Sequence, residues 1–308
     1  MTAYYGHDAI DYLASKIKQV DPKSSSHWNH FHSKFDYHDG KFSGVEGFGS
    51  NRQVFSGLRG LAHNIFQIPF RAMGKKFSNF EKIDRVAKGI LSKQDKGYSL
   101  DVLRQVITLA YLEDKKVVKN NATSCVIGDG YGTMTCLLFE NNHQRIISVN
   151  LSKTLLMDLW QIKLFLGDKF EEVVLVTEKH DIPETLLKTN NKPSIIAIEA
   201  ENHNLIRLFP LDLSINIASM QEMNPEIVEE YFEDISIATL RGGAFYCCNR
   251  EEKILPDGTK SIFSNYPWHL SRESLEDDLC PWHLKYYNLK VPFYHSYDGP
   301  ARHRLVKF

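Results

Sequence analysis

Short apolar runs alternate along residues 97–250 with stretches in which apolar residues recur at helical spacing. The runs have the length of strands that are buried on both faces of a sheet. The predicted strands cover residues 125–127, 145–150, 173–177, 194–198, 211–219 and 244–249. The predicted helices cover residues 99–116, 134–139, 152–165 and 226–235, with a short one starting at Pro183 and with Ser99 and Ser152 as caps. This alternation predicts an α/β fold with a doubly wound, mostly parallel sheet.

The first 96 residues have a less regular pattern, and we expect an N-terminal helical or lid region over 1–96 and a main domain over 97–308. Helices are predicted over residues 8–20 and 80–91. A glycine-rich stretch over residues 40–60 is either a lid that excludes water from a cleft or a surface loop.

An aromatic and polar segment with four histidines lies before the glycine-rich stretch. His27, His30, His32 and His38 match no spacing known for metal ligands, and no carboxylate completes a site. We therefore predict no metal and expect this segment to pack over a cleft.

The segment Ser124–Gly132 reads Ser-Cys-Val-Ile-Gly-Asp-Gly-Tyr-Gly and joins a predicted strand to a predicted helix. Gly128, Gly130 and Gly132 allow a tight turn and the close approach of a ligand, because a Cβ at any of them would intrude. The free N–H groups of the next helix point to the same place. A strand, a glycine turn and a helix in this order predict a site for a nucleotide-type cofactor.

The spacing of the glycines favours one cofactor over another. A dinucleotide site needs Gly-x-Gly-x-x-Gly, with a pyrophosphate at the helix N-terminus, whereas this chain has Gly-x-Gly-x-Gly followed by Thr133. The turn resembles motif I of the S-adenosylmethionine (SAM) methyltransferases, which binds an amino acid and a ribose without a phosphate. A glycine-rich turn of some other α/β protein is the alternative.

Further cofactor contacts are expected where other predicted strands end, because ligands of such sheets bind outside the carboxyl ends of the strands. Asn150 follows Gly128 by 22 residues, at a position where an acidic residue usually binds the ribose hydroxyls. Glu201 is placed to bind an adenine amino group, or it belongs to an ordinary loop. The predicted cofactor residues are Gly128, Asp129, Gly130, Tyr131, Gly132, Asn150, Leu151, Glu201, Asn202, Asn216, Ala218 and Ser219.

A second motif points to a family. Asn216-Ile-Ala-Ser219-Met-Gln221-Glu222-Met, followed by the pair Tyr231-Phe232, resembles a stretch of the bacterial sugar O-methyltransferases. The resemblance covers roughly residues 97–250 and is weaker on either side. It implies a Rossmann-like class I SAM methyltransferase domain and methyl transfer to a hydroxyl of a nucleotide-linked sugar or of a glycan. It also implies that the 216–222 segment forms the floor of the active site.

Methyl transfer to a weakly acidic hydroxyl calls for a general base and a pocket for the acceptor. Glu222 is the first candidate base, although it could equally cap the next helix. Catalytic roles are also predicted for His269 and His283, which end the two copies of a Pro-Trp-His segment. The indoles offer flat faces for sugar C–H groups. The predicted acceptor residues are Trp268, Trp282 and Gln221.

Composition narrows the class of protein. The 308 residues carry a formal net charge of −1, so no field of one sign would attract nucleic acid or a membrane surface. No apolar run has membrane-spanning length, and the N-terminus shows no signal pattern. Five cysteines without a Cys-x-x-Cys pair suit reduced thiols, so we expect a cytoplasmic protein. The expected partners are a small-molecule or glycan acceptor and a second copy of the chain in a homo-oligomer.

Three other functions compete with sugar methylation. An NAD-dependent sugar epimerase or dehydrogenase would need Gly-x-Gly-x-x-Gly and Tyr-x-x-x-Lys, and the sequence contains neither at the expected places. A methyltransferase that acts on a non-sugar small molecule remains an alternative. A catalytically inactive binding protein with the same fold is a third, since Asn150 replaces the usual acid.

Overall fold

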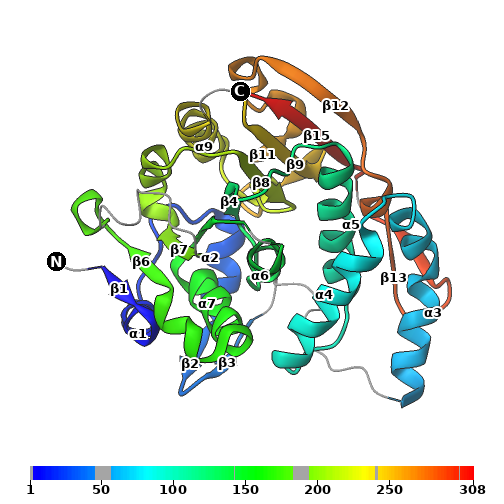
Figure 1. The fold of residues 1–308 in the computed structure, drawn as a ribbon, viewed down its shortest axis with the longest axis horizontal. Coiled ribbons are helices and arrows are strands. Elements are labelled where there is room, and N and C mark those ends of the chain that lie inside the picture. The colour runs from blue at the N-terminus through cyan, green and yellow to red at the C-terminus, as the bar shows by residue number, and fades with distance from the viewer. Residues whose placement is uncertain (1–2, 46–56, 142, 183–193, 240–241, 298) are drawn as a thin grey trace.

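A nine-stranded sheet forms the centre of the computed structural model, which describes residues 3–45, 57–141, 143–182, 194–239, 242–297 and 299–308 (Figure 1). The strand order is β1-β6-β7-β5-β4-β8-β9-β15-β12. In that order the strands span Tyr4–Tyr5, Val174–Val176, Ser194–Glu199, Arg145–Asn150, Thr123–Ile127, Leu213–Ile217, Ala244–Arg250, Ala301–Lys307 and Glu273–Leu279. The six strands from β6 to β9 in this order are parallel to one another. Strand β1 at one edge, and β15 and β12 at the other, are antiparallel to the strands they pair with.

Apolar layers cover both faces of this sheet, and alternate residues of one strand enter different layers. In β4, Val126 packs into one layer, whereas Cys125 and Ile127 pack into the other. The first layer contains α1 (Gly6–Ser15), α4 (Phe80–Lys93), α5 (Leu100–Asp114), α6 (Thr133–Glu140) and α7 (Ser152–Leu166). The second contains α9 (Pro225–Ala238) and the 3-10 turns over Ala200–Leu208. The predicted α/β, doubly wound and mostly parallel architecture is confirmed.

Smaller elements surround this core. Two further helices, α2 (Ser26–His32) and α3 (Gly57–Gly74), lie at the margin of the first layer, and Phe70 of α3 and Trp28 of α2 contact it. The hairpins are β2 (Asp36–His38) with β3 (Lys41–Ser43), β10 (Glu252–Ile254) with β11 (Lys260–Ile262), and β13 (Lys285–Tyr287) with β14 (Tyr294–Ser296). None of the described helices has the length and apolar character needed to cross a membrane.

Two predicted helix caps have different outcomes. The Ser99 hydroxyl accepts a hydrogen bond from the Val102 N–H at 3.2 Å, so it caps α5 as expected. Ser152 does not cap α7, because the N-cap position is Leu151. The Ser152 N–H instead donates to Asp21 Oδ2 at 2.6 Å, and its hydroxyl donates to Glu199 Oε1 at 2.7 Å. The start of α7 is thus stabilised by a residue that is 131 positions away in the chain.

The N-terminal region is attached to the sheet and to its helices. Strand β1 pairs with β6, α1 packs on α7, and both α3 and α4 pack on α5. The helix predicted over residues 8–20 ends at Ser15. Residues 57–60 of the predicted loop already belong to α3, while residues 46–56 and the helix predicted from Pro183 lie outside the described residues.

Candidate functional site

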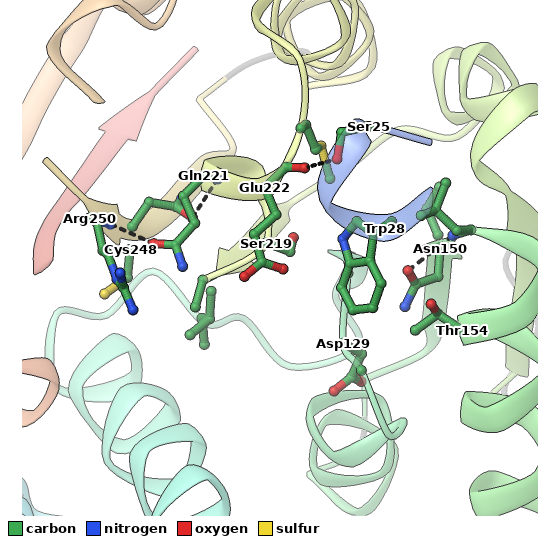
Figure 2. Close-up of a pocket in the computed structure, with 18 of the residues that line it drawn as sticks. Ser25, Trp28, Asp129, Asn150, Thr154, Ser219, Gln221, Glu222, Cys248 and Arg250 are labelled. Carbon is green, nitrogen blue, oxygen red and sulfur yellow. Dashed lines mark hydrogen bonds between the residues drawn. The ribbon is translucent and has the colours of Figure 1, made fainter. Parts of the chain in front are cut away.

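A cavity of about 350 Å³ opens at the carboxyl ends of the parallel strands (Figure 2). Residues that end or follow β4, β5, β7, β8 and β9 line it. Eight of the predicted cofactor residues are in the lining: Gly128, Asp129, Gly130, Tyr131, Asn150, Leu151, Ala218 and Ser219. They meet there because parallel strands end at the same edge of a sheet.

The glycine turn has two positions with different requirements. Gly128 has φ +73°, and a Cβ built on it would lie 2.2 Å from the Ser219 hydroxyl oxygen. Gly130 has φ +84°, and among the described residues nothing lies within 4 Å of a Cβ built there. Gly128 is therefore required by packing against the floor segment, whereas Gly130 leaves the wall of the cavity open beside the backbone.

Carboxylates of the protein itself occupy the N–H groups beside the turn. Asp129 accepts hydrogen bonds from the N–H groups of Met134 and Thr135 at 3.0 and 2.7 Å, at the N-terminus of α6. Asp158 of α7 accepts from the Gly132 N–H at 3.1 Å and from the Asn150 amide at 2.8 Å. Burial raises the pKa of both carboxyl groups. An additional anion at this helix terminus would find its donors already bound and two acidic groups next to it.

Asp158, which the sequence pattern did not indicate, connects the glycine turn to the end of β5 through its hydrogen bonds with Gly132 and Asn150. It is fully buried. A polar residue between Leu155, Leu156 and Leu159 on the apolar face of a helix is the signal that could have identified it. Asn150, which it holds, also accepts a hydrogen bond from the Leu151 N–H at 3.0 Å.

The floor segment after β8 is held by Asn216, which is buried and does not line the cavity. Its amide donates to the Ile127 carbonyl at 2.9 Å and accepts from the Asn249 amide at 2.8 Å. Ala218, with φ +58°, donates its N–H to the Cys248 carbonyl at 2.7 Å. The motif therefore joins β4, β8 and β9 beneath the cavity.

Glu222 lines the cavity and connects the floor to the segment that covers it. Its Oε1 lies 2.6 Å from Lys253 Nζ and 3.5 Å from His27 Nε2. Its carbonyl accepts a hydrogen bond from the Ser25 hydroxyl. Figure 2 shows the carboxylate of Glu222 and the indole of Trp28 pointing into the same space. Trp28 belongs to the aromatic segment that the sequence places over a cleft, and Ser25 lies just before that segment.

The opposite wall is formed by α5, which the sequence did not predict to contribute, and by the C-terminal part of the chain. Arg104 is buried and donates to Asp101 Oδ1 at 2.9 Å and to the Tyr297 hydroxyl at 2.6 Å. It also donates to the carbonyls of Trp282 and Lys285 at 3.0 and 2.7 Å. Burial acts to lower the pKa of Arg104, but Asp101 and Tyr297 outweigh it and the pKa is raised. Arg104 thus remains a cation and fixes the C-terminal wall.

No family model and no curated protein matches this chain. Solved structures with a similar fold include magnesium protoporphyrin IX methyltransferase from Synechocystis PCC 6803 with bound SAH, at 9% identity and a TM-score of 0.42, covering 67% of this chain and 82% of that one. A SAM-dependent methyltransferase from Methanosarcina mazei matches at 9% identity and TM-score 0.38, covering 63% and 95%. The methyltransferase domain of bacterial CtHen1 matches at 13% identity and a TM-score of 0.41, and the match covers 68% of this chain and 100% of that one. These neighbours are SAM-dependent methyltransferases. At such identities the likeness is one of fold alone.

The remaining predicted residues are spread over the molecule. Gln221 and His283 line the cavity. Trp282 is in the core, where its indole N–H donates to Thr108 Oγ1 at 3.0 Å, and Trp268 donates to the Phe263 carbonyl at 2.7 Å away from the cavity. His269 is exposed. Of the two Pro-Trp-His segments, only the second reaches the cavity, and it does so with its histidine.

Three predicted cofactor residues are also outside the cavity lining. Gly132 begins α6 with φ +63° and packs near Ile162. Glu201 forms an ion pair with Lys16 at 2.6 Å in a separate hollow of about 110 Å³. Asn202 does not line the cavity either. The ion pair holds the Glu201 carboxylate beside the C-terminal end of α1, in the hollow that Lys16 also lines.

Proposed function

We propose that this protein is a SAM-dependent O-methyltransferase that acts on a hydroxyl group of a sugar. The observation that carries the proposal is the glycine turn, where Gly130 borders the cavity and Asp129 occupies the N–H groups at the start of α6. A dinucleotide cofactor needs those N–H groups for its pyrophosphate. A cofactor with an amino acid, a ribose and a sulfonium, but no phosphate, does not.

The residues present fit such a cofactor. The cavity volume of about 350 Å³ lies in the range of small-molecule and cofactor sites. The backbone from Gly128 to Tyr131 would hold one end, and Asn150 with Thr154 provides polar groups beside the indole of Trp28 (Figure 2). SAM would supply an electrophilic methyl group. The α2 segment, through Trp28, would exclude water from it.

The distal part of the cavity suits a polyhydroxylated acceptor. Donors and acceptors for hydroxyl groups come from four parts of the fold, namely α5, the floor segment, β9 and the segment after β14, and they include Asp101, Gln105, Gln221, Arg250 and Tyr297. The guanidinium carbons of Arg104 and Arg250 lie 5.1 and 5.4 Å from the centre of the Tyr297 ring. These contacts stiffen an aromatic face on which the C–H side of a sugar ring can pack.

Glu222 is the residue that we assign to remove the acceptor proton. Its carboxylate faces the cavity, and Lys253 and His27 fix its position from behind. A positioned carboxylate that accepts a proton as the oxygen attacks contributes typically about 10²- to 10⁴-fold to a rate. Gln221 would orient the acceptor from the floor, and Asn249 holds Gln221 in place by accepting a hydrogen bond from its N–H at 3.1 Å.

Binding and turnover test the proposal separately. In calorimetry, SAM and its demethylated product should bind one per chain, and NAD should not bind. Transfer of labelled methyl groups should be seen with nucleotide-linked sugars or glycan fragments. Glu222→Gln should lower kcat at least about 100-fold with little change in SAM affinity, whereas the control Glu201→Gln should leave kcat unchanged. Binding of NAD in place of SAM would contradict the cofactor, and turnover of non-sugar acceptors alone would contradict the substrate.

A further inference from the structure

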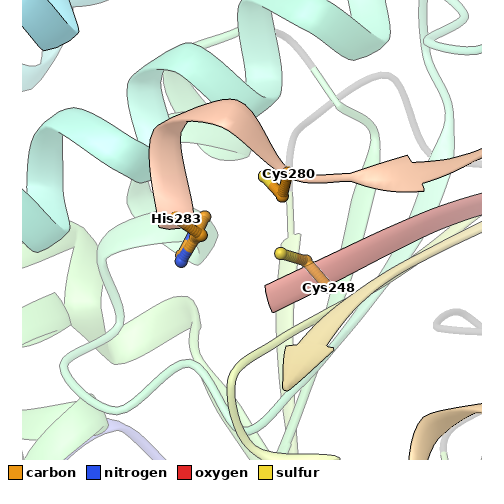
Figure 3. Close-up of side chains that lie close together, drawn as sticks. All are labelled: Cys248, Cys280 and His283. Carbon is orange, nitrogen blue, oxygen red and sulfur yellow. The ribbon is translucent and has the colours of Figure 1, made fainter. Parts of the chain in front are cut away.

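Three side chains of types that bind metal ions meet beside the cavity. Cys248 belongs to β9, Cys280 follows β12, and His283 lies in the turn after it. One ligand atom from each lies within 4.8 Å of the other two, and all three residues are buried. Figure 3 shows the two thiols and the imidazole around a common space. Two thiols and an imidazole are a donor set that zinc prefers.

We propose that Cys248, Cys280 and His283 bind a zinc ion. Tetrahedral zinc has Zn–S distances of about 2.3 Å and Zn–N distances of about 2.0–2.1 Å, so its ligand atoms lie roughly 3.5–3.8 Å apart. The observed limit of 4.8 Å exceeds this spacing by at most about 1.0–1.3 Å. Small side-chain rotations close such a gap without movement of the strands.

The imidazole of His283 provides an independent sign of a missing ligand. Its Nε2 is buried and has no hydrogen-bond partner among the described residues. A buried polar group without a hydrogen-bond partner destabilises the folded state by about 1–3 kcal/mol, and buried nitrogens normally have a partner. A metal ion between Nε2 and the two thiols would satisfy it.

The local sequence and its supports hold the turn in place. Cys280-Pro281-Trp282-His283 has ligands at the first and fourth positions of a tight turn, in which the His283 N–H donates to the Cys280 carbonyl at 2.9 Å. Arg104 holds the Trp282 carbonyl, and Thr108 holds the indole. The other Pro-Trp-His segment has Tyr266 in place of the cysteine, and its histidine is exposed. The zinc hypothesis thus accounts for what distinguishes the two copies.

Charge and protons balance in the binding step. Zinc would bind to the imidazole and to two thiols that release their protons, which gives a site without net charge next to the Arg104 cation. Cys248 and His283 also line the cavity, so the fourth position opens toward it. A water molecule or an acceptor hydroxyl bound there would have a lowered pKa. This role in the reaction rests on the proposed function, whereas the binding of zinc does not.

The experiment uses the full chain, freed of metal with a chelator under reducing conditions and then titrated with Zn²⁺ or Co²⁺. We expect one metal ion per chain and, with cobalt, thiolate charge-transfer bands and tetrahedral d–d bands. Outer-sphere partners of a zinc site contribute about 10- to 100-fold to affinity, so Cys280→Ser and His283→Gln should weaken zinc binding by more than about 100-fold. The matched controls Cys247→Ser and His269→Gln should bind zinc like the unmodified chain.

Several results would overturn the assignment. They are a cobalt form without thiolate bands, zinc retained by both ligand variants, or zinc lost equally from the controls. If the ligand variants fail to fold by circular dichroism, the cobalt spectrum of the unmodified chain decides alone. Calorimetry with SAM on the same sample separates the two proposals. A chain that binds SAM but no zinc would contradict only the zinc site, and a chain that binds zinc but no SAM would contradict only the proposed function.

Discussion

Replacement of Gly130 by alanine tests whether a ligand lies against the turn. No atom of the described residues lies within 4 Å of the added Cβ, so the folded state is destabilised only by the left-handed backbone conformation at φ +84°. That conformation costs a residue other than glycine about 1–2 kcal/mol. Gly258, in the exposed turn between β10 and β11, has φ +90° and equally open surroundings, so Gly258→Ala is a matched control. Both variants should lose about 1–2 kcal/mol of unfolding free energy.

The two variants should differ in cofactor binding. A methyl group forced into a well-packed contact typically costs about 1–3 kcal/mol. At Gly130 it would occupy the space beside the backbone that we assign to the cofactor, so the affinity for SAM or its demethylated product should fall about 5- to 150-fold. Gly258→Ala should bind with unchanged affinity, because Gly258 is not in the cavity lining.

Urea unfolding and calorimetric titration of the demethylated cofactor give both quantities on the same preparations. The reasoning would be refuted if Gly130→Ala lost stability like the control and still bound the cofactor with full affinity. The cofactor would then not be held against this turn, and the dinucleotide argument based on Asp129 would lose its meaning.

Three further substitutions test other parts of the structure. Gly128→Ala adds a Cβ 2.2 Å from the Ser219 hydroxyl, so backbone strain and overpacking should together remove about 2–5 kcal/mol in urea unfolding. Arg104→Met removes the charged donor of the Trp282 and Lys285 carbonyls and should remove about 3–5 kcal/mol, because each hydrogen bond to a charged group contributes about 1.5–3 kcal/mol, seen as a large fall in Tm. Burial lowers the pKa of His143 from 6.5 to about 4, so as the pH falls between these values the unfolded chain takes up a proton that the folded chain does not. His143→Asn should therefore lose about 3 kcal/mol less stability than the unmodified chain between pH 7 and pH 4, measured by unfolding at both pH values.

The central sheet could be predicted because its strands are buried on both faces. Such strands consist of continuous apolar residues, so β4, β5 and β7 are evident without knowledge of their neighbours. Strand β12 was missed, because Glu-Ser-Leu-Glu-Asp-Asp-Leu resembles a polar loop. It becomes a strand by pairing with β15, where Asp277 forms ion pairs with Arg302 and Arg304 at 2.9 and 2.5 Å. That pairing joins segments that local periodicity cannot connect.

The site was predictable only where topology alone determines position. Residues that directly follow parallel strands reach one edge, and this places Gly130, Asn150 and Ser219 at the cavity. Side-chain direction is a different matter, since Trp268 and Asn216 have plausible chemistry but turn away from the cavity. Periodicity does not determine which way a residue in an irregular turn points.

The carboxylate of Asp129 shows how one sheet edge can be directed to one class of ligand. A helix that follows a glycine turn offers free N–H groups with a partial positive charge, which favours an anion. In this protein the turn supplies the anion from its own sequence, at the position between the first two glycines. Asp158 takes up the Gly132 N–H in the same way. Asp158 is buried and Asp129 is half-buried at the cavity, so these hydrogen bonds offset part of the cost of removing the two carboxylates from water, and a bound phosphate would have to displace them. Exclusion of phosphate from the start of α6 is therefore built into the framework beneath the turn, in agreement with the proposed cofactor, which has no phosphate.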